Sequence, residues 1–251
     1  MNQEWNAEKY ASDFSFVYDY GNDVTKLLDG DNIRSVLDLG CGNGALSERL
    51  FNKGYSVIGM DSSEKMLAAA RERFPKIKFV RADAADFSLE QPVDAVFSNA
   101  VLHWINKGKQ PAVASCVYNA LKSGGRFVFE MGGKGNNALI HAALERTFEE
   151  AGLKYEMPFY FPSVGEYASI LEKAGFKVGY AVLFDRPTEL KGENGMAEWI
   201  KMFVNVPFSG IDEKTRSELV GRAAEKLRGA LFAGGKWYAD YVRLRMKATK
   251  E

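Results

Sequence analysis

The chain has 251 residues, of which 46% are hydrophobic and 26% are charged. These fractions are ordinary for a globular protein with a sizeable core, so they exclude a disordered, collagenous or coiled-coil chain. Lysine plus arginine number 33, as do aspartate plus glutamate, and the formal net charge is therefore zero. Domains that bind nucleic acid usually carry a basic excess, so we expect no nucleic-acid partner.

The chain has two cysteines, Cys41 and Cys116, and two histidines, His103 and His141, which leaves little material for a metal site. We therefore predict no metal. The opening MNQEWNAEKY lacks the basic and apolar segments of a signal peptide, and no run of 18 apolar residues predicts a membrane span. We expect a cytoplasmic protein with no membrane partner. The sequence leaves the oligomeric state open.

The first half of the chain alternates short apolar runs with helical patterns. The predicted strands are residues 33–39, 55–60, 77–81, 93–98 and 126–131, and the predicted helices are 45–52, 63–74 and 110–122. Nearly continuous apolar runs are typical of parallel strands covered on both faces. The alternation predicts a doubly wound α/β sheet.

After residue 131 the rhythm changes. We predict helices at 137–151 and 164–174, a strand at 176–185, helical pieces at 196–204 and 213–231, and a last strand at 236–247. The expected sheet is mostly parallel and seven-stranded, with a helical cap inserted before its last strand. The predicted division is a core over 31–185, a cap over 186–235 and the last core strand within 236–251.

Residues 1–30 are predicted to form N-terminal lid helices rich in aromatic side chains. Six aromatic residues lie among the first twenty, and Tyr10 is one of them. The segment fits a helix packed on the core and also a lid over a ligand, and one segment can do both.

The segment VLDLGCGNGALS, residues 36–47, carries the strongest functional signal. A predicted strand ends at Leu39, glycines occupy positions 40, 42 and 44, and a predicted helix follows. Glycine permits positive φ angles and close approach of a ligand to the main chain, with a helix N-terminus behind it. Asp61 ends the next strand, where its carboxylate can accept hydrogen bonds from both hydroxyls of a ribose. The alternative role for Asp61 is a helix N-cap.

The glycine spacing separates two classes of cofactor. A nicotinamide site expects G-x-G-x-x-G, whereas this chain has D-x-G-x-G-x-G from Asp38 to Gly44, with the third glycine one position early. This glycine spacing therefore disfavours NAD as the cofactor.

A third landmark follows the third predicted strand, in RADAADF. There Asp83 can accept from an adenine amino group while the Ala84 amide donates to a ring nitrogen.

Over residues 36–131 these landmarks, together with FSNAVLHW after the fourth strand, resemble class I S-adenosylmethionine-dependent methyltransferases. The resemblance implies S-adenosylmethionine as the cofactor and a last strand antiparallel between the fifth and sixth. The cofactor-binding residues it implies are Asp38, Gly40, Cys41 and Gly42 for the methionine part, Asp61 and Ser62 for the ribose, Met66 beside the adenosine, Asp83 and Ala84 for the adenine, Asn99 near the methionine amino group, and Tyr10. We interpret the Cys41 side chain as a small space-filler.

SNAVLHWI and the opening W-N-A-x-x-Y are most similar to the trans-aconitate methyltransferase group, whose members methylate small carboxylic acids. This implies a small-molecule acceptor, O-methylation of a carboxylate, and His103 and Trp104 as the catalytic residues beside it. A carboxylate is already ionised at neutral pH, so no base is required. His103 then orients a substrate oxygen or is a structural histidine, and Trp104 belongs to the core or faces the sulfonium.

Other functions remain open at this point. An N- or C-methyltransferase, or one acting on an acyl group held by a carrier protein, would share the same landmarks. A non-catalytic module that binds S-adenosylmethionine is the alternative from another class. Transfer of the methyl group to any acceptor would eliminate the non-catalytic module.

Overall fold

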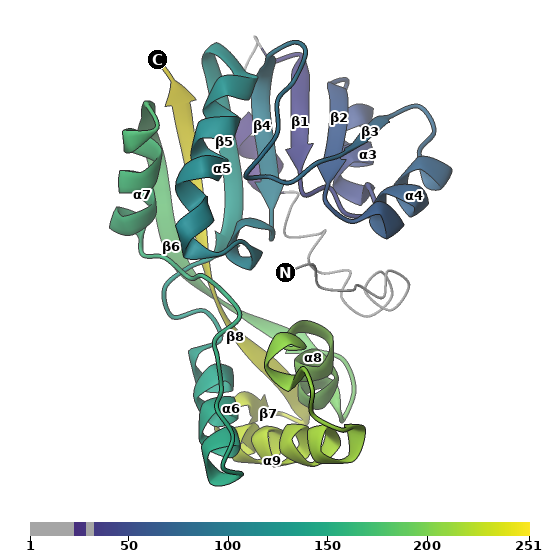
Figure 1. Cartoon of the computed structure of the whole chain (residues 1–251), viewed down its shortest axis with the longest axis vertical. Coiled ribbons are helices and arrows are strands. Elements are labelled where there is room, and N and C mark those ends of the chain that lie inside the picture. Colours follow the sequence, from purple (N-terminus) through teal and green to yellow (C-terminus); the bar gives the residue numbers. More distant parts are fainter. Residues whose placement is uncertain (1–22, 29–32) are drawn as a thin grey trace. The chain divides into compact units, whose positions relative to one another are not determined.

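The computed structural model of the chain describes residues 23–28 and 33–251 (Figure 1). Most of the predicted N-terminal lid, with Tyr10, lies outside these residues. The chain forms two compact units. The first contains the described residues up to Gly133, together with Tyr160–Leu183 and Leu244–Glu251, and the second contains Lys134–Phe159 and Phe184–Arg243.

The predicted strands and helices of residues 33–251 are all present. The strands are β1 Ser35–Leu39, β2 Ser56–Asp61, β3 Lys78–Arg81, β4 Val93–Asn99, β5 Leu121–Gly132, β6 Phe176–Leu190, β7 Phe232–Ala233 and β8 Lys236–Lys250. The α-helices are α3 Ala45–Asn52, α4 Glu64–Arg73, α5 Gln110–Ala120, α6 Ala138–Glu150, α7 Val164–Lys173, α8 Gly195–Phe203 and α9 Glu213–Leu231. Short 3₁₀ turns are η1 Lys26–Leu28, η2 Leu102–Trp104, η3 Lys107–Lys109 and η4 Val206–Phe208.

The strands form one mixed sheet in the order β3-β2-β1-β4-β5-β8-β6. The pairs β1–β2, β1–β4, β2–β3 and β4–β5 are parallel. The last strand lies between β5 and β6, which confirms the order that the family resemblance predicted. An eighth strand, the two-residue β7, pairs with β8 in antiparallel fashion. It was not predicted, because two residues carry no periodic pattern.

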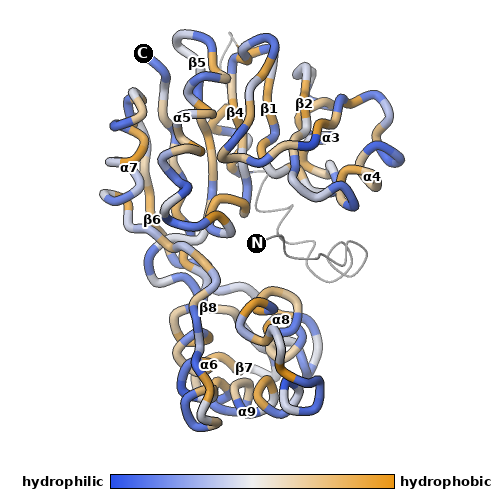
Figure 2. The backbone as a smooth tube through the Cα atoms, in the orientation of Figure 1, coloured by the Kyte–Doolittle hydropathy of each residue, from blue (hydrophilic) through white to orange (hydrophobic). Residues whose placement is uncertain are grey.

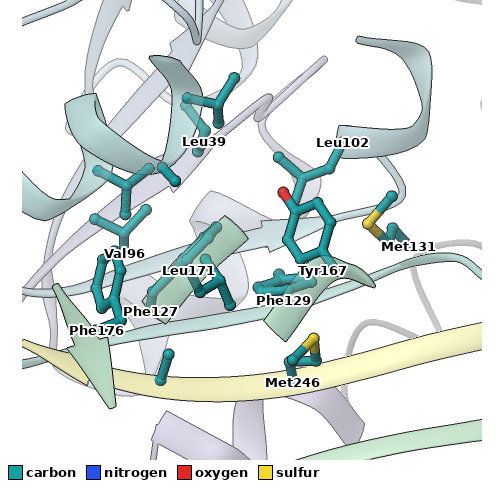
Figure 3. Close-up of a cluster of buried hydrophobic side chains, with 14 of the residues drawn as sticks. Leu39, Val96, Leu102, Phe127, Phe129, Met131, Tyr167, Leu171, Phe176 and Met246 are labelled. Carbon is teal, nitrogen blue, oxygen red and sulfur yellow. The ribbon is translucent and has the colours of Figure 1, made fainter. Parts of the chain in front are cut away.

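The first unit is covered on both faces of its sheet. Leu37 and Leu39 of β1 belong to one buried cluster, which the helices α5 and α7 complete (Figure 3). Val36, on the opposite face of the same strand, belongs to a second cluster, which α3 and α4 complete. Figure 2 shows the apolar character of β1, β4 and β5, which burial on both faces explains. The doubly wound α/β prediction is therefore confirmed.

The second unit contains the predicted cap helices α8 and α9, and also α6. The Phe148 ring of α6 packs edge-to-face on Phe208, with ring centroids 5.0 Å apart. Glu150, at the end of α6, accepts hydrogen bonds from Arg222 and Lys226 of α9, both at 2.9 Å. These contacts join α6 to the helices that follow it in the chain, so this unit is larger than residues 186–235.

Within residues 23–28 and 33–251, no helix has both the length and the apolar character that crossing a membrane requires.

Candidate active site

The three loop glycines all adopt left-handed backbone conformations, but the space around each of them differs. Their φ angles are +77° at Gly40, +54° at Gly42 and +80° at Gly44. A Cβ atom at Gly40 would lie 2.3 Å from a Val101 methyl group, and one at Gly44 would lie 2.9 Å from the Phe79 ring. A Cβ at Gly42 would meet no atom within 4 Å. Packing therefore requires glycine at positions 40 and 44, while Gly42 leaves open space above the main chain.

Asp61 holds the glycine loop against the start of α4. Its Oδ2 accepts from the Gly42 N–H at 2.9 Å and its Oδ1 from the Ser63 N–H at 2.8 Å. The N-cap of α4 is Ser63, whose hydroxyl accepts from the Met66 N–H, so the N-cap alternative for Asp61 is wrong. A carboxylate offers about four acceptor positions, so both oxygens can still accept from a ligand.

Two further groups lie buried beneath the loop. Burial raises the pKa of Asp38 to about 7; the hydrogen bond from the Ser47 hydroxyl opposes this rise, and the nearby Asp61 carboxyl adds to it. Burial likewise raises the pKa of the Cys41 thiol. A thiol with a raised pKa is a poor nucleophile, which favours the space-filling role. The Cys41 main chain contributes to the loop, since its N–H donates to the Met60 carbonyl at 2.9 Å.

Asp83 and Ala84 follow β3, at the same edge of the sheet. Asp83 Oδ1 accepts from the Ala85 N–H at 2.9 Å, and its Oδ2 accepts from Lys109 Nζ at 3.3 Å. The bond from Ala85 is the main reason that the pKa of Asp83 lies below its usual value. Lys109 lies 26 residues along the chain, so the local pattern around Asp83 did not predict this contact.

The end of β4 lies beside the end of β1. The Ser98 hydroxyl donates to the Leu39 carbonyl at 2.8 Å, and Asn99 is buried directly after it. Ala100 then takes a left-handed conformation with φ of +60°, and its N–H donates to the Glu130 carbonyl at 2.8 Å. For a residue with a Cβ this conformation costs roughly 1–2 kcal/mol, so the chain turns sharply here at an energetic cost.

His103 lies in the turn η2, three residues beyond Ala100, and is buried. The Gly132 N–H donates to His103 Nδ1 at 3.2 Å, and the His103 carbonyl accepts from the Tyr160 N–H at 3.0 Å. The rings of Trp104 and Phe161 lie with centroids 5.6 Å and 5.9 Å from the imidazole. Because Nδ1 accepts a hydrogen bond, the proton of the neutral ring is on Nε2.

The first unit thus brings most of the predicted site residues to the carboxyl ends of β1 to β4. Ser62, whose carbonyl accepts from Arg81 Nε at 3.3 Å, and the buried Met66 lie where β2 passes into α4. Tyr10 lies outside the described residues. His141 belongs to the second unit, where burial lowers its pKa to about 4 and its Nδ1 lies 2.6 Å from the Tyr155 hydroxyl. In the described part of the chain, no three His, Cys, Asp or Glu side chains are grouped as a metal would require.

Comparison with known proteins agrees with this geometry. The model of the methyltransferase domain family matches residues 36–125, from β1 into the start of β5. The Schizosaccharomyces pombe methyltransferase C70.08c is 32% identical over 98% of both chains. The present chain belongs to the class I S-adenosylmethionine-dependent methyltransferases.

This methyltransferase is also similar to the trans-aconitate 2-methyltransferase of Rhizobium etli, with 27% identity over 91% of this chain and 87% of the relative. Among solved structures, a Bacillus halodurans protein described as a methyltransferase superposes with a TM-score of 0.64. It covers 92% of this chain and 98% of its own, and it is 17% identical. The low identity limits that comparison to the fold.

Proposed function

We propose that this S-adenosylmethionine-dependent methyltransferase methylates a carboxylate oxygen of a small organic acid. The observation that carries the proposal is the hydrogen bond from Gly132 N–H to His103 Nδ1. It leaves the imidazole with a donor at Nε2 and with no free basic nitrogen. Such a ring binds an anionic oxygen and is a poor base for a protonated acceptor. The relatives named trans-aconitate 2-methyltransferases support the same class of acceptor.

The cofactor fits the residues at the edge of the sheet. The open space above Gly42 admits the methionine part, with Asp38, Gly40, Cys41 and Asn99 around it. Asp61 has both oxygens oriented by main-chain N–H groups and receives the ribose hydroxyls, with Ser62 and Met66 on the adjoining helix. Asp83 and Ala84 receive the adenine. This assignment explains why Gly42 lacks a packing partner where its two neighbouring glycines have one.

The protein residues mainly align the reacting groups. Bound S-adenosylmethionine supplies an already activated methyl group, so no proton has to move when the acceptor is a carboxylate. His103 Nε2 would donate to one carboxylate oxygen and leave the other free to attack the methyl carbon. As that O–C bond forms, the bond from the methyl carbon to the sulfonium sulfur would break, and the sulfur would leave as a neutral thioether. The Trp104 ring, next to His103, offers an aromatic face to the sulfonium. The reaction needs this alignment more than it needs acid–base chemistry.

The decisive experiment measures transfer of a labelled methyl group into a panel of small acids, amines and phenols that includes trans-aconitate. We expect transfer into acids, with a product that alkali hydrolyses as an ester. We also expect no inflection of kcat/KM near the ordinary histidine pKa of about 6.5. Transfer into amines or phenols alone, with a rate that rises through that pKa, would refute the proposal.

The cytoplasmic location remains a prediction.

A further inference from the structure

A buried glutamine holds the turn that carries His103. Gln110, the first residue of α5, is fully buried. Its side-chain Nε2 donates to the Leu102 carbonyl at 2.9 Å and to the Ile105 carbonyl at 2.7 Å. These two carbonyls lie on either side of His103 and Trp104 in the sequence. One side chain therefore fixes the main chain of the turn at both ends.

Tyr167 of α7 fixes the orientation of that glutamine. Its hydroxyl donates to Gln110 Oε1 at 2.9 Å, and its ring is fully buried in the cluster that contains Leu102 (Figure 3). An amide turned by 180° would place Oε1 against two carbonyl oxygens, which cannot donate to it. The donor at the oxygen end thus favours the arrangement in which both N–H groups reach the turn.

The contact that sets the proton of His103 is sensitive to small movements of this turn. The bond from Gly132 N–H to His103 Nδ1 is 3.2 Å long, at the long end of the range for such bonds. A shift of a few tenths of an ångström would take the two nitrogen atoms beyond this range and weaken the bond. The ring could then carry its proton on Nδ1, and Nε2 would present a lone pair that repels a carboxylate.

We infer that Gln110 and Tyr167 are positioning residues, which hold the His103 turn so that the imidazole keeps its proton on Nε2. This inference rests on the proposed function where it concerns the acceptor. The effect on the imidazole itself is independent of the acceptor. The two parts are therefore tested separately.

The first test is nitrogen NMR of the imidazole rings. The chain has only two histidines, so His141→Gln assigns both sets of signals. We expect His103 of the unmodified protein to be in the Nε2–H form. Tyr167→Phe and Gln110→Met should shift it to a mixture of both forms. The control is Val117→Ala, a fully buried position in α5 that makes no bond to the turn, which should lower the melting temperature and leave the His103 signals unchanged.

The inference is wrong if the His103 signals of Tyr167→Phe match those of the unmodified protein, or if Val117→Ala shifts them equally. Tyr167→Phe retains the ring and is the variant to rely on if Gln110→Met fails to fold.

The second test is kinetic, with trans-aconitate as the probe acid. We expect Tyr167→Phe to lower kcat/KM for the acid by about tenfold, with the cofactor Kd nearly unchanged, because it weakens one contact to a charged acceptor. In a His103→Ala background the same change should have almost no further effect, because both act through one ring. Losses that multiply in the double variant would overturn the inference.

The outcomes separate the two proposals. If no acid is methylated, the proposed function fails and NMR alone decides the positioning role. If an acid is methylated but His103→Ala leaves kcat/KM unchanged, the role of His103 at the acceptor fails, methylation of the acid stands, and NMR again decides the positioning role. If His103→Ala impairs the reaction and Tyr167→Phe changes neither the spectrum nor kcat/KM, the positioning role fails and the proposed function stands.

Discussion

The glycine loop and the His103 turn occupy neighbouring strand ends, and they are built in different ways. The loop is held mainly by main-chain groups of adjacent strands, for instance the Gly40 and Cys41 N–H groups, which donate to the Met60 carbonyl. The turn is held by Gln110, Gly132, Tyr160 and Tyr167, which come from four separate segments. A site of the first kind leaves a compact motif in the sequence, whereas a site of the second kind leaves none.

The difference is chemically reasonable. Glycines and one carboxylate form the loop from a short stretch and the end of the next strand. The His103 turn takes its partners from several separate segments, which a short stretch of chain cannot supply. Each of the following measurements tests one side of this contrast.

Asp61→Ala should produce the largest effect, on the cofactor side. In the proposed cofactor site it would remove the acceptor for two ligand hydroxyls, and it also releases the Gly42 and Ser63 N–H groups. At roughly 1.5–3 kcal/mol for each charge-assisted bond, affinity for S-adenosylmethionine should fall by about 10²–10⁴-fold in calorimetry. Glu72→Ala, an exposed change on α4, is the control. Equal affinities in the two variants would remove Asp61 from the site.

Asp38→Asn tests the buried carboxyl beneath the loop. Because the folded pKa of about 7 exceeds the unfolded value of 3.8, the folded state binds the proton more tightly between these values. The free energy of unfolding should therefore fall as pH rises from 4 to 7, by up to about 1.4 kcal/mol per unit for this group. The asparagine variant should lack this component in urea titrations. Parallel pH profiles of the two proteins would contradict the assignment.

Gly42→Ala and Gly40→Ala test whether each glycine is needed for cofactor binding or for packing within the protein. Gly42→Ala should cost about 1 kcal/mol of stability, since its φ is positive, and should weaken cofactor binding because the methyl group enters open space. Gly40→Ala meets Val101 and should mainly lower the melting temperature. Calorimetry and thermal unfolding distinguish the two. A Gly42→Ala protein with unchanged cofactor affinity would show that the ligand does not approach there.

His103→Gln should give the smallest effect, on the acceptor side. Glutamine retains a side-chain N–H donor, so kcat/KM for the acid should fall by less than about tenfold. No inflection should develop in the pH–rate profile. A collapse of about 10²–10⁴-fold at unchanged cofactor affinity would instead assign His103 as a base and would overturn the carboxylate proposal.

The sequence pattern predicted the doubly wound sheet, because buried parallel strands are continuous apolar runs and helices repeat with a period of 3.6 residues. The position of the last strand, between the fifth and the sixth, came from the family resemblance. The sequence also singled out Asp61, the last residue of β2, and Asp83, two residues after β3, as candidate cofactor-binding residues, because both lie where a strand ends. Two strands are longer than the apolar pattern predicted: β5 begins at Leu121 rather than at residue 126, and β6 continues to Leu190 rather than to residue 185. In these stretches charged and turn residues interrupt the apolar runs, and strand pairing extends the elements.

Only the tertiary structure decided three matters. It placed α6 in the second unit, through the Phe148 and Glu150 contacts. It showed that Ser63 caps α4 and that Asp61 bridges the loop to that helix, a distinction that adjacent polar residues do not make in a sequence. It brought Gln110 and Tyr167, 57 residues apart, against the His103 turn. Local propensity acts over a few residues, whereas the proton of a histidine depends on which distant donor reaches it, and only the folded chain brings that donor within range.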